Sequence, residues 1–328
     1  MSDRREFCRF SVALMLGAFR ALSVPNLLFG NTKNSLDIWS APALIGLPLA
    51  IAMTNGKARD ILNLNYKEWR NPDQLRAGFA GGSFMLCASP CNIAANLYNQ
   101  GVDVKMLNIL TNGLNYIFSK HQNINELKDL QGKKLIMSFK NDLPDIIFKA
   151  LCKAFGVDIE QINITYVQTP PEAVMLFLRR EFDAILTQEP IASAMQLKAQ
   201  NNGIKIHRSI DIQTLWASKF QDCPQIPQAG LIVRGEFYKR NLEFFNTFYN
   251  DLQNALKRIN SSPNQAAKFG TKYLLAPQDA IKNAIAYSNF TLQKCSDITN
   301  NLNNFFEIIY RINPKLIGGK IPSQGLYL

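Results

Sequence analysis

Apolar and polar stretches alternate along the middle of the chain in a way that predicts strands followed by helices. The expected order is a strand over 134–137, an amphipathic helix over 143–155, a strand over 163–167, a helix over 172–180 and a strand over 184–186. Alternating strands and helices imply crossover connections and a parallel sheet covered by helices on both faces. We therefore expect an α/β fold.

The same alternation continues on both sides of this stretch. Strands are predicted over 35–39, 61–66, 84–87, 104–109, 204–207 and 229–233, and helices over 42–53, 69–77, 89–98, 191–200 and 211–219. From residue 236 on, the pattern predicts helices alone, beginning with a long helix over 236–260 whose apolar residues share one broad face.

The loops after the predicted strands are the candidate site, because ligands of parallel sheets lie beyond the carboxyl ends of the strands. These loops do not combine a nucleophile with a base, and they hold no metal-binding cluster. These loops therefore predict a ligand-binding site without a catalytic residue, a metal or a cofactor. The candidate ligand-binding residues are Trp39, Ser40, Pro42, Ser89, Cys91, Asn92, Ser138, Asn141, Asp142, Gln188 and Glu189.

Several of these residues have an alternative role in the fold itself. Trp39 would stack on a ligand or pack as an ordinary core aromatic. Ser89 and the N–H groups after it would hold an oxyanion, or Ser89 would simply cap a helix. Asn141 and Asp142 would contact the ligand or cap the helix after them. Glu189 would likewise face the ligand or cap its helix.

The charges of these loops bear on the kind of ligand. No arginine is placed in them, although a charge-assisted clamp would be expected for sulfonate or nitrate. Asp142 and Asp145 argue against a bare anion and leave room for an amine or a ring nitrogen.

The first residues resemble a twin-arginine export signature. Arg4 and Arg5 are followed by Phe7, Arg9 and an apolar run over 10–19 that is too short to span a bilayer. We expect residues 1–30 to direct the folded protein to a bacterial periplasm. The alternative is an amphipathic cytosolic helix. Because no clean cleavage site is present, the segment would be either removed or kept as an anchor.

The formal net charge of the 328-residue chain is +11. Its basic residues are dispersed and no nucleic-acid motif is recognised, so we expect a solvated surface and no nucleic-acid partner. The same positive net charge would also suit a small anionic ligand.

Five cysteines remain after the first 30 residues, and with two histidines they do not predict a metal site. We expect them to be small buried residues. The alternative is a metal site or a reactive thiol at the first two. The five are Cys87, Cys91, Cys152, Cys223 and Cys295.

Five segments follow one another in an order that carries a family resemblance. They are Asp129–Lys134 (DLQGKK), Phe182–Pro190, Ile232–Arg234, Pro263–Ala267 and Ile317–Pro322. Together they resemble the periplasmic substrate-binding component of ABC importers in the nitrate, sulfonate, taurine and thiamine-precursor group. The similarity covers nearly the whole chain after the export signal.

This resemblance implies a type II periplasmic binding protein fold. Two Rossmann-like α/β lobes would be joined by two crossings, near 111–116 and 224–230, with a helical C-terminal region. Lobe one would contain 34–112 plus 229–328, and lobe two 115–228. The lobes would close around a small organic molecule or an oxyanion that is sulfonate-, nitrate- or pyrimidine-like.

The resemblance also implies partners. The ligand would be delivered to an ABC permease and its ATPase at the inner membrane, after export by the twin-arginine translocase. The alternative is an enzyme on the same fold, similar to the synthases of a thiamine pyrimidine precursor. Those enzymes use a cysteine-rich motif, and Leu86–Cys91 has only scattered cysteines.

Overall fold

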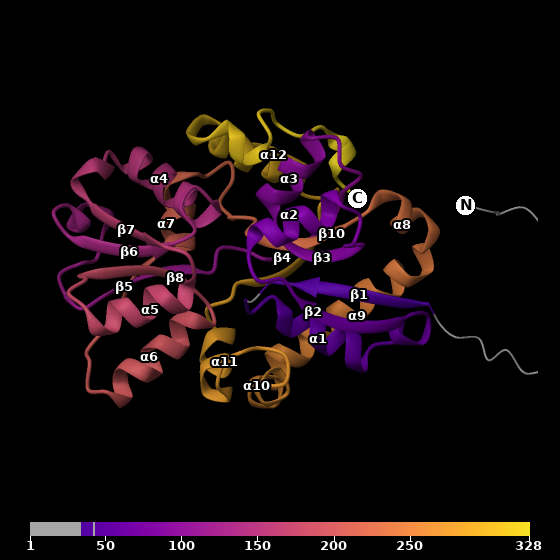
Figure 1. The fold of residues 1–328 in the computed structure, drawn as a ribbon, viewed down its shortest axis with the longest axis horizontal. Helices are drawn as coiled ribbons and strands as arrows, with labels where there is room; N and C mark the ends of the chain where they lie inside the picture. Colours follow the sequence, from indigo (N-terminus) through magenta and orange to yellow (C-terminus); the bar gives the residue numbers. More distant parts are fainter. Residues whose placement is uncertain (1–33, 42) are drawn as a thin grey trace, which may run out of the picture. The chain divides into compact units, whose positions relative to one another are not determined.

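The strands of the described residues, 34–41 and 43–328, form two mixed sheets in this computed structural model (Figure 1). Residues 34–328 belong to one compact unit. The predicted export signal, residues 1–30, and the candidate residue Pro42 lie outside the described residues.

The first sheet has six strands in the order β11-β4-β10-β3-β1-β2. β1 runs parallel to β2 and β3, whereas β10 runs antiparallel to β3 and β4, and β11 antiparallel to β4. The bounds are β1 (Ser35–Ser40), β2 (Asn63–Glu68), β3 (Leu86–Pro90), β4 (Lys105–Thr111), β10 (Ala229–Val233) and β11 (Phe290–Lys294).

The second sheet has five strands in the order β7-β6-β8-β5-β9. β6 is parallel to β7 and β8, and β5 is antiparallel to β8 and β9. The bounds are β5 (Asn115–Ser119), β6 (Lys134–Ser138), β7 (Asn163–Val167), β8 (Ala184–Gln188) and β9 (His207–Asp211).

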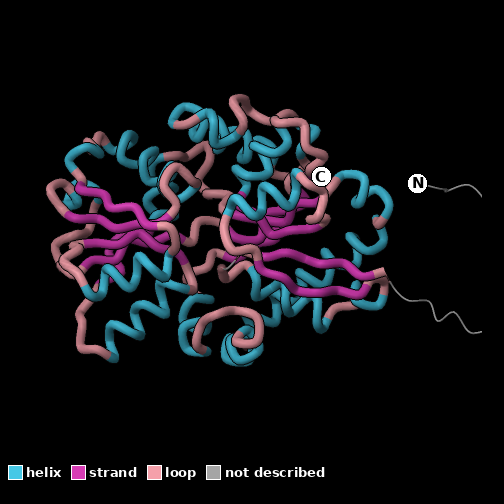
Figure 2. Tube along the Cα trace, in the orientation of Figure 1, coloured by secondary structure: helices cyan, strands magenta, loops and turns pink. Residues whose placement is uncertain are grey.

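Helices cover both faces of each sheet (Figures 1 and 2). α1 and α9 lie on one face of the first sheet and α2 and α3 on the other, while α5 and α6 lie opposite α4 and α7 on the second sheet. The bounds are α1 (Gly46–Asn55), α2 (Pro72–Ala80), α3 (Cys91–Asn99), α4 (Leu143–Phe155), α5 (Pro170–Arg179), α6 (Ile191–Asn201), α7 (Ile212–Lys219), α8 (Gly235–Arg240), α9 (Leu242–Ser261), α10 (Pro263–Gly270), α11 (Gln278–Ile285) and α12 (Thr299–Ile312).

Short 3-10 turns complete the chain. They are η1 (Ala58–Asp60), η2 (Leu127–Leu130), η3 (Ile159–Gln161), η4 (Pro314–Ile317) and η5 (Gln324–Leu326). Among the C-terminal helices, α11 packs against α6 and α12 against α4, so they contact helices of the second sheet. No helix of the described chain has the length and apolar character needed to cross a membrane.

Several helices begin with the same local chemistry. The side chains of Asn71, Asp142 and Thr169 accept a hydrogen bond from a backbone N–H of the first turn of α2, α4 and α5. A proline in the first turn of each helix fits there because the N–H that it lacks would have no partner within the helix.

Three features of the predicted fold are wrong. The sheets are mixed rather than parallel, because β5 and β10 enter them antiparallel to their neighbours. The segment after 236 is not helical throughout, since β11 pairs with β4 at the edge of the first sheet. The long predicted helix is also divided, at Asn241, into α8 and α9.

The chain passes from the first sheet to the second between β4 and β5, and it returns between α7 and β10. Gln213 joins these two crossings, because its Oε1 accepts from the N–H groups of Gly113 and Ile226, each over 3.0 Å. A Cβ at Gly113 would lie 2.9 Å from that Oε1, so glycine permits the close approach. The predicted lobe boundaries stay a prediction, with which this sheet membership agrees.

Candidate functional site

A cavity of about 340 Å³ lies where loops from the two sheets meet. Its wall includes residues at or just after the carboxyl ends of β1, β2, β3 and β4 in the first sheet, and of β6, β7 and β8 in the second. β5 and β10 reach the same edge with their amino ends because they are antiparallel. The wall is mainly apolar with a few polar groups, which is the usual character of a small-molecule pocket.

The loop after β6 has a strained backbone at this cavity. Phe139 has a φ of 62° and Asn141 a φ of 60°, in the left-handed region that is uncommon for residues other than glycine. The N–H of Asn141 donates to Oδ2 of Asp145 over 2.7 Å, which holds the loop in this conformation. Strain of this kind concentrates at ligand sites, and Phe139 lines the cavity.

Asp145 supports this loop from inside the second sheet's core. Its side chain is fully buried, forms an ion pair of 2.8 Å with Nζ of Lys149, and accepts a hydrogen bond of 2.9 Å from the Tyr166 hydroxyl. The carboxylate of Asp145 is therefore used by the protein itself.

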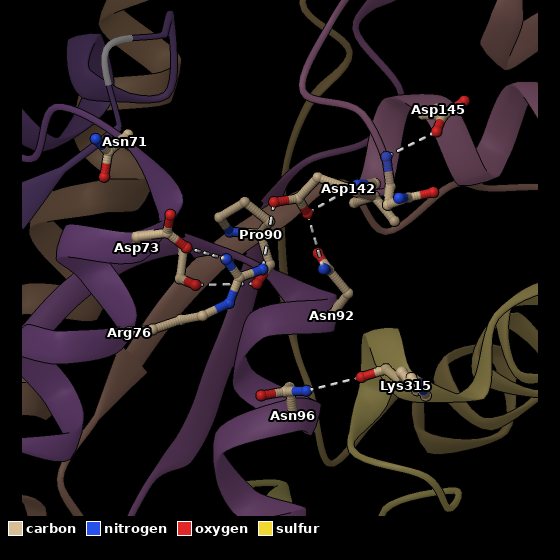
Figure 3. A network of polar contacts seen from close by, with 12 residues as sticks. Asn71, Asp73, Arg76, Pro90, Asn92, Asn96, Asp142, Asp145 and Lys315 are labelled. Carbon is tan, nitrogen blue, oxygen red and sulfur yellow. Dashed lines mark hydrogen bonds and ion pairs between the residues drawn. The ribbon is translucent and has the colours of Figure 1, made fainter. Parts of the chain in front are cut away.

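Asp142 lines the cavity and also connects the loop after β6 of the second sheet to helices that cover the first sheet (Figure 3). Its Oδ1 accepts from Nδ2 of Asn92 on α3 over 3.1 Å and from the N–H of Leu143 over 2.8 Å. Its Oδ2 forms an ion pair of 3.3 Å with Arg76 on α2. Arg76 in turn contacts Asp73 over 3.1 Å. We call the contacts of Asn92 and Arg76 with Asp142 the clasp.

Glu68, at the end of β2, is the second carboxylate in the cavity wall. It is half-buried, and this burial raises the pKa of its carboxyl group. The Tyr66 hydroxyl donates to its Oε1 over a long 3.4 Å. Within the described chain no cation forms an ion pair with Glu68. Its charge therefore has no cationic partner among the described residues.

Arg70 follows on the same wall, and its side chain is exposed to solvent. Water therefore solvates this charge, whereas Glu68 is partly withdrawn from water.

Asn115 and Gln228 contribute amides from the two crossings. Both line the cavity and are buried, and Nδ2 of Asn115 donates to Oε1 of Gln228 over 3.0 Å. Oδ1 of Asn115 has no hydrogen-bond partner among the described residues. The place where the chain crosses between the sheets is thus part of the wall.

Two of the predicted site residues, Asp142 and Gln188, line the cavity. A third, Asn92, does not line it and bonds to Asp142 instead. Glu189 is buried, where it accepts from the N–H of Ser193 over 3.0 Å and forms an ion pair of 2.6 Å with Arg208. It therefore has the capping role that was its alternative.

The remaining predicted residues that the structure describes also lie outside the cavity wall. The Trp39 ring stacks on Phe84 with their centroids 4.0 Å apart, as in the core-aromatic alternative. The hydroxyls of Ser40 and Ser89 each donate to the carbonyl of the next residue, over 3.2 and 2.9 Å. Ligand contact by these residues stays a prediction, as it does for three further residues outside the wall: Cys91, Ser138 and Asn141.

Several residues of the wall are not among the predicted site residues. Glu68 and Trp69 were not considered because the predicted strand stopped at 66, two residues short of the end of β2. Phe139 stands inside a loop from which only polar residues were selected. Asn115 was missed with the whole of β5. The rule that ligands lie at the carboxyl ends of strands, applied with the observed bounds, would have found Glu68, Trp69 and Phe139, whereas Asn115 lies at the amino end of the antiparallel β5.

The described cysteines are all free and buried, as expected. None of them lines the cavity. Burial raises the pKa of Cys152 and of Cys223 to about 12, and raises those of Cys87 and Cys91 well above the ordinary value. No group of three His, Cys, Asp or Glu side chains suited to a metal ion occurs within 34–41 and 43–328.

The sequence profile described as NMT1/THI5 like matches residues 62–266, more than half of the chain. A search of curated protein sequences finds no match.

Solved structures match over most of the chain. An ABC transporter protein from Parabacteroides distasonis is 16% identical, with a TM-score of 0.75 and coverage of 90% of this chain and 98% of that one. The periplasmic aliphatic sulphonate binding protein SsuA from Escherichia coli is 17% identical, with a TM-score of 0.68 and coverage of 89% and 98%. The alkanesulfonate-binding protein SsuA from Xanthomonas axonopodis pv. citri, bound to MOPS, is 14% identical, with a TM-score of 0.66 and coverage of 88% and 98%. The fold is that of periplasmic binding proteins.

Proposed function

Since the chain belongs to the NMT1/THI5 like family, we propose that it is the solute-binding component of an ABC importer. One observation carries this proposal above the others. The cavity is walled by strand-end loops of both sheets, so a molecule inside it would be held from both sides. Two lobes that close around a solute present a closed form that a partner can recognise, and no covalent chemistry is needed.

The ligand would contact the cavity wall directly. Asp142 and Gln188 are the predicted site residues that we propose as contacts, together with Glu68 and Phe139. Asn92 would act through Asp142, to which it is bonded. The apolar wall would surround the body of a small organic molecule, and the polar groups would orient it.

The periplasm is the proposed location, with export through the twin-arginine translocase and delivery to a permease and its ATPase. The support is the signature over 4–9 and the transport names of proteins with this fold. Fractionation of a bacterial host that expresses the full chain tests the export step. Replacing Arg4 and Arg5 with lysine should leave the protein in the cytoplasm, whereas Arg20→Lys should not. A cytoplasmic location of the unmodified chain would overturn the export proposal.

We favour transport over an enzyme on the same fold because the matching solved structures carry transport names. The two functions differ in what happens to a captured compound. A binding protein returns the compound unchanged, whereas an enzyme releases a product, so mass spectrometry of the compound after incubation separates them.

Thermal denaturation of the full chain tests the binding function. The panel would contain alkanesulfonates, nitrate, aminopyrimidines and organic amines, with a cell extract as a further sample. A compound at about 100 times its Kd stabilises the folded state by about 2.7 kcal/mol, which raises the Tm by about 5 °C. Gln188→Ala should reduce the shift, and Gln131→Ala, an amide outside the cavity, should leave it unchanged. No shift with any compound, and none with extract, would contradict the proposal.

A further inference from the structure

The polar groups of the cavity differ in whether the protein already satisfies them. Oδ1 of Asp142 accepts two hydrogen bonds, and its Oδ2 forms an ion pair with Arg76. Asp145, just outside the wall, is paired with Lys149. Glu68 is the carboxylate in the wall that has neither an ion pair nor a close hydrogen bond within the described chain.

The placement of Glu68 makes this lack of a partner costly. A carboxylate that is partly withdrawn from water loses hydration, and a cation or a hydrogen-bond donor has to replace it. Arg70, the cation on the same wall, is exposed and forms no ion pair with Glu68. An exposed charge keeps its water and needs no ligand, so the demand for a partner comes from Glu68.

Other groups in the cavity wall also favour a cationic ligand. Trp69 and Phe139 line the cavity, and the faces of aromatic rings attract cations. Oδ1 of Asn115 is a buried acceptor with no partner among the described residues. The Glu68 carboxylate and Oδ1 of Asn115 are thus two acceptors that lack a close partner, whereas a bare sulfonate or nitrate is itself an acceptor and would need donors.

The net charge of +11 does not oppose this conclusion. Net charge acts over long range on the rate of encounter, whereas the groups in contact with the ligand decide the stability of the complex.

From these observations, and resting on the proposed binding function, we infer that the cavity takes a small organic cation. The ligand would have an apolar body and an amine or amidine group paired with Glu68. This class differs from the sulfonates named for two of the matching structures.

A series of single-ring probes tests the inference on the full chain. Benzylamine and benzamidine carry the positive charge, benzyl alcohol is neutral, and benzenesulfonate is negative. Calorimetric titration should show binding of the cations at least about tenfold tighter than binding of benzyl alcohol, because a hydrogen bond to a charged group is worth at least that much. Benzenesulfonate should bind most weakly.

A matched pair of variants assigns the effect to Glu68. Glu68→Gln should weaken binding of the cations about tenfold to a hundredfold, with no loss for benzyl alcohol. Glu243→Gln changes the net charge equally on an exposed residue outside the cavity, and should have no effect. The Tm of each variant without probe checks that it folds.

The pH dependence gives a second measure. The cation affinity of the unmodified protein should fall as pH decreases through the pKa of Glu68, and that of Glu68→Gln should stay flat. Other titratable groups around Glu68 contribute a background that both proteins share. They are Tyr66, Lys67, Asp142, Lys272 and Tyr273.

Two outcomes overturn the inference. In the first, benzenesulfonate binds more tightly than benzylamine, and Glu68→Gln strengthens it further; the binding function then stands with an anionic ligand. In the second, no probe binds at millimolar concentration. The shift with cell extract described above then decides the binding function separately.

Discussion

Asn92 and Asp142 are joined by a hydrogen bond of 3.1 Å from Nδ2 to Oδ1, between a helix that covers the first sheet and the loop that leads from the second sheet into α4. Arg76, on α2, forms an ion pair with the same carboxylate. Asp142 therefore lines the cavity and also connects the part of the chain that contains the second sheet to the part that contains the first sheet (Figure 3). Capture of a ligand and the separation of the two sides are therefore physically linked.

Loss of the clasp should favour a more open protein. Asn92→Ala removes a hydrogen bond to a charged group, so we expect the closed form to lose about 1.5 kcal/mol, or about tenfold in the ratio of closed to open molecules. Small-angle scattering should then show a larger radius of gyration without ligand. Asn96→Ala is the matched control, since Asn96 lies on the same helix and donates to the Lys315 carbonyl on the same side. Equal scattering curves for both variants and the unmodified protein would contradict the prediction.

Removing one partner of the buried ion pair of Glu189 and Arg208 should destabilise the protein strongly. Their side chains are 0% and 14% exposed, and the Arg208 guanidinium lies 3.8 Å from the ring centroid of Tyr287. Glu189→Gln leaves Arg208 buried without a counter-charge, so we expect a loss of about 3–5 kcal/mol in the free energy of unfolding by urea.

Two further variants control this measurement. Glu236→Gln breaks a surface pair with Lys239, whose side chains are 62% and 69% exposed, and should cost less than about 1 kcal/mol. The double variant Glu189→Gln, Arg208→Leu should lose less than the sum of its single changes, because it leaves no unpaired charge. Additive losses would show that the two residues do not act as a pair.

The link between the crossings should depend on Gln213. Gln213→Leu leaves the buried N–H groups of Gly113 and Ile226 without their acceptor, at about 1–3 kcal/mol each. Gln200→Leu, on an exposed face of α6, should stay within about 0.5 kcal/mol. Urea denaturation that ranks Gln213→Leu with Gln200→Leu would exclude the proposed link.

The buried thiols should make the protein sensitive to alkali. Burial raises the pKa of Cys152 from 9.0 to about 12, so above pH 9 its thiol ionises in the unfolded chain but not in the folded one. The unfolded state then binds fewer protons, and stability falls by about 1.4 kcal/mol per pH unit for each such thiol. Urea midpoints between pH 8 and 10 measure the slope. Cys152→Val should reduce the slope by the share of one thiol, and an unchanged slope would contradict this account.

The parts of the fold that local chemistry determines could be predicted from the sequence. α4 has its predicted bounds because Asp142 caps its first turn and Gly156, with φ of 68°, ends it. β5 and β11 could not be predicted in the same way. They are short, and β11 exists because it pairs with β4, far away in the chain. Such pairing leaves no local signal, so the mixed character of the sheets was missed.

The candidate site shows the same limit. Asp142 and Gln188 were found because the rule on strand ends needs only the order of strands and helices. Trp39 and Glu189 were placed by the same rule, yet each is engaged by a partner that the order does not reveal, Phe84 for the ring and Arg208 for the carboxylate. The direction of a side chain depends on such partners.

The five buried, unpaired thiols bear on how the chain would tolerate an oxidising compartment. Disulfide formation begins with attack by a thiolate, and burial keeps these sulfurs both protonated and out of reach. In a protein that leaves the cytoplasm already folded, these cysteines would stay buried and reduced during export. The odd number of cysteines among the described residues would then cause no mispairing, and these residues would need neither an oxidase nor an isomerase at their destination.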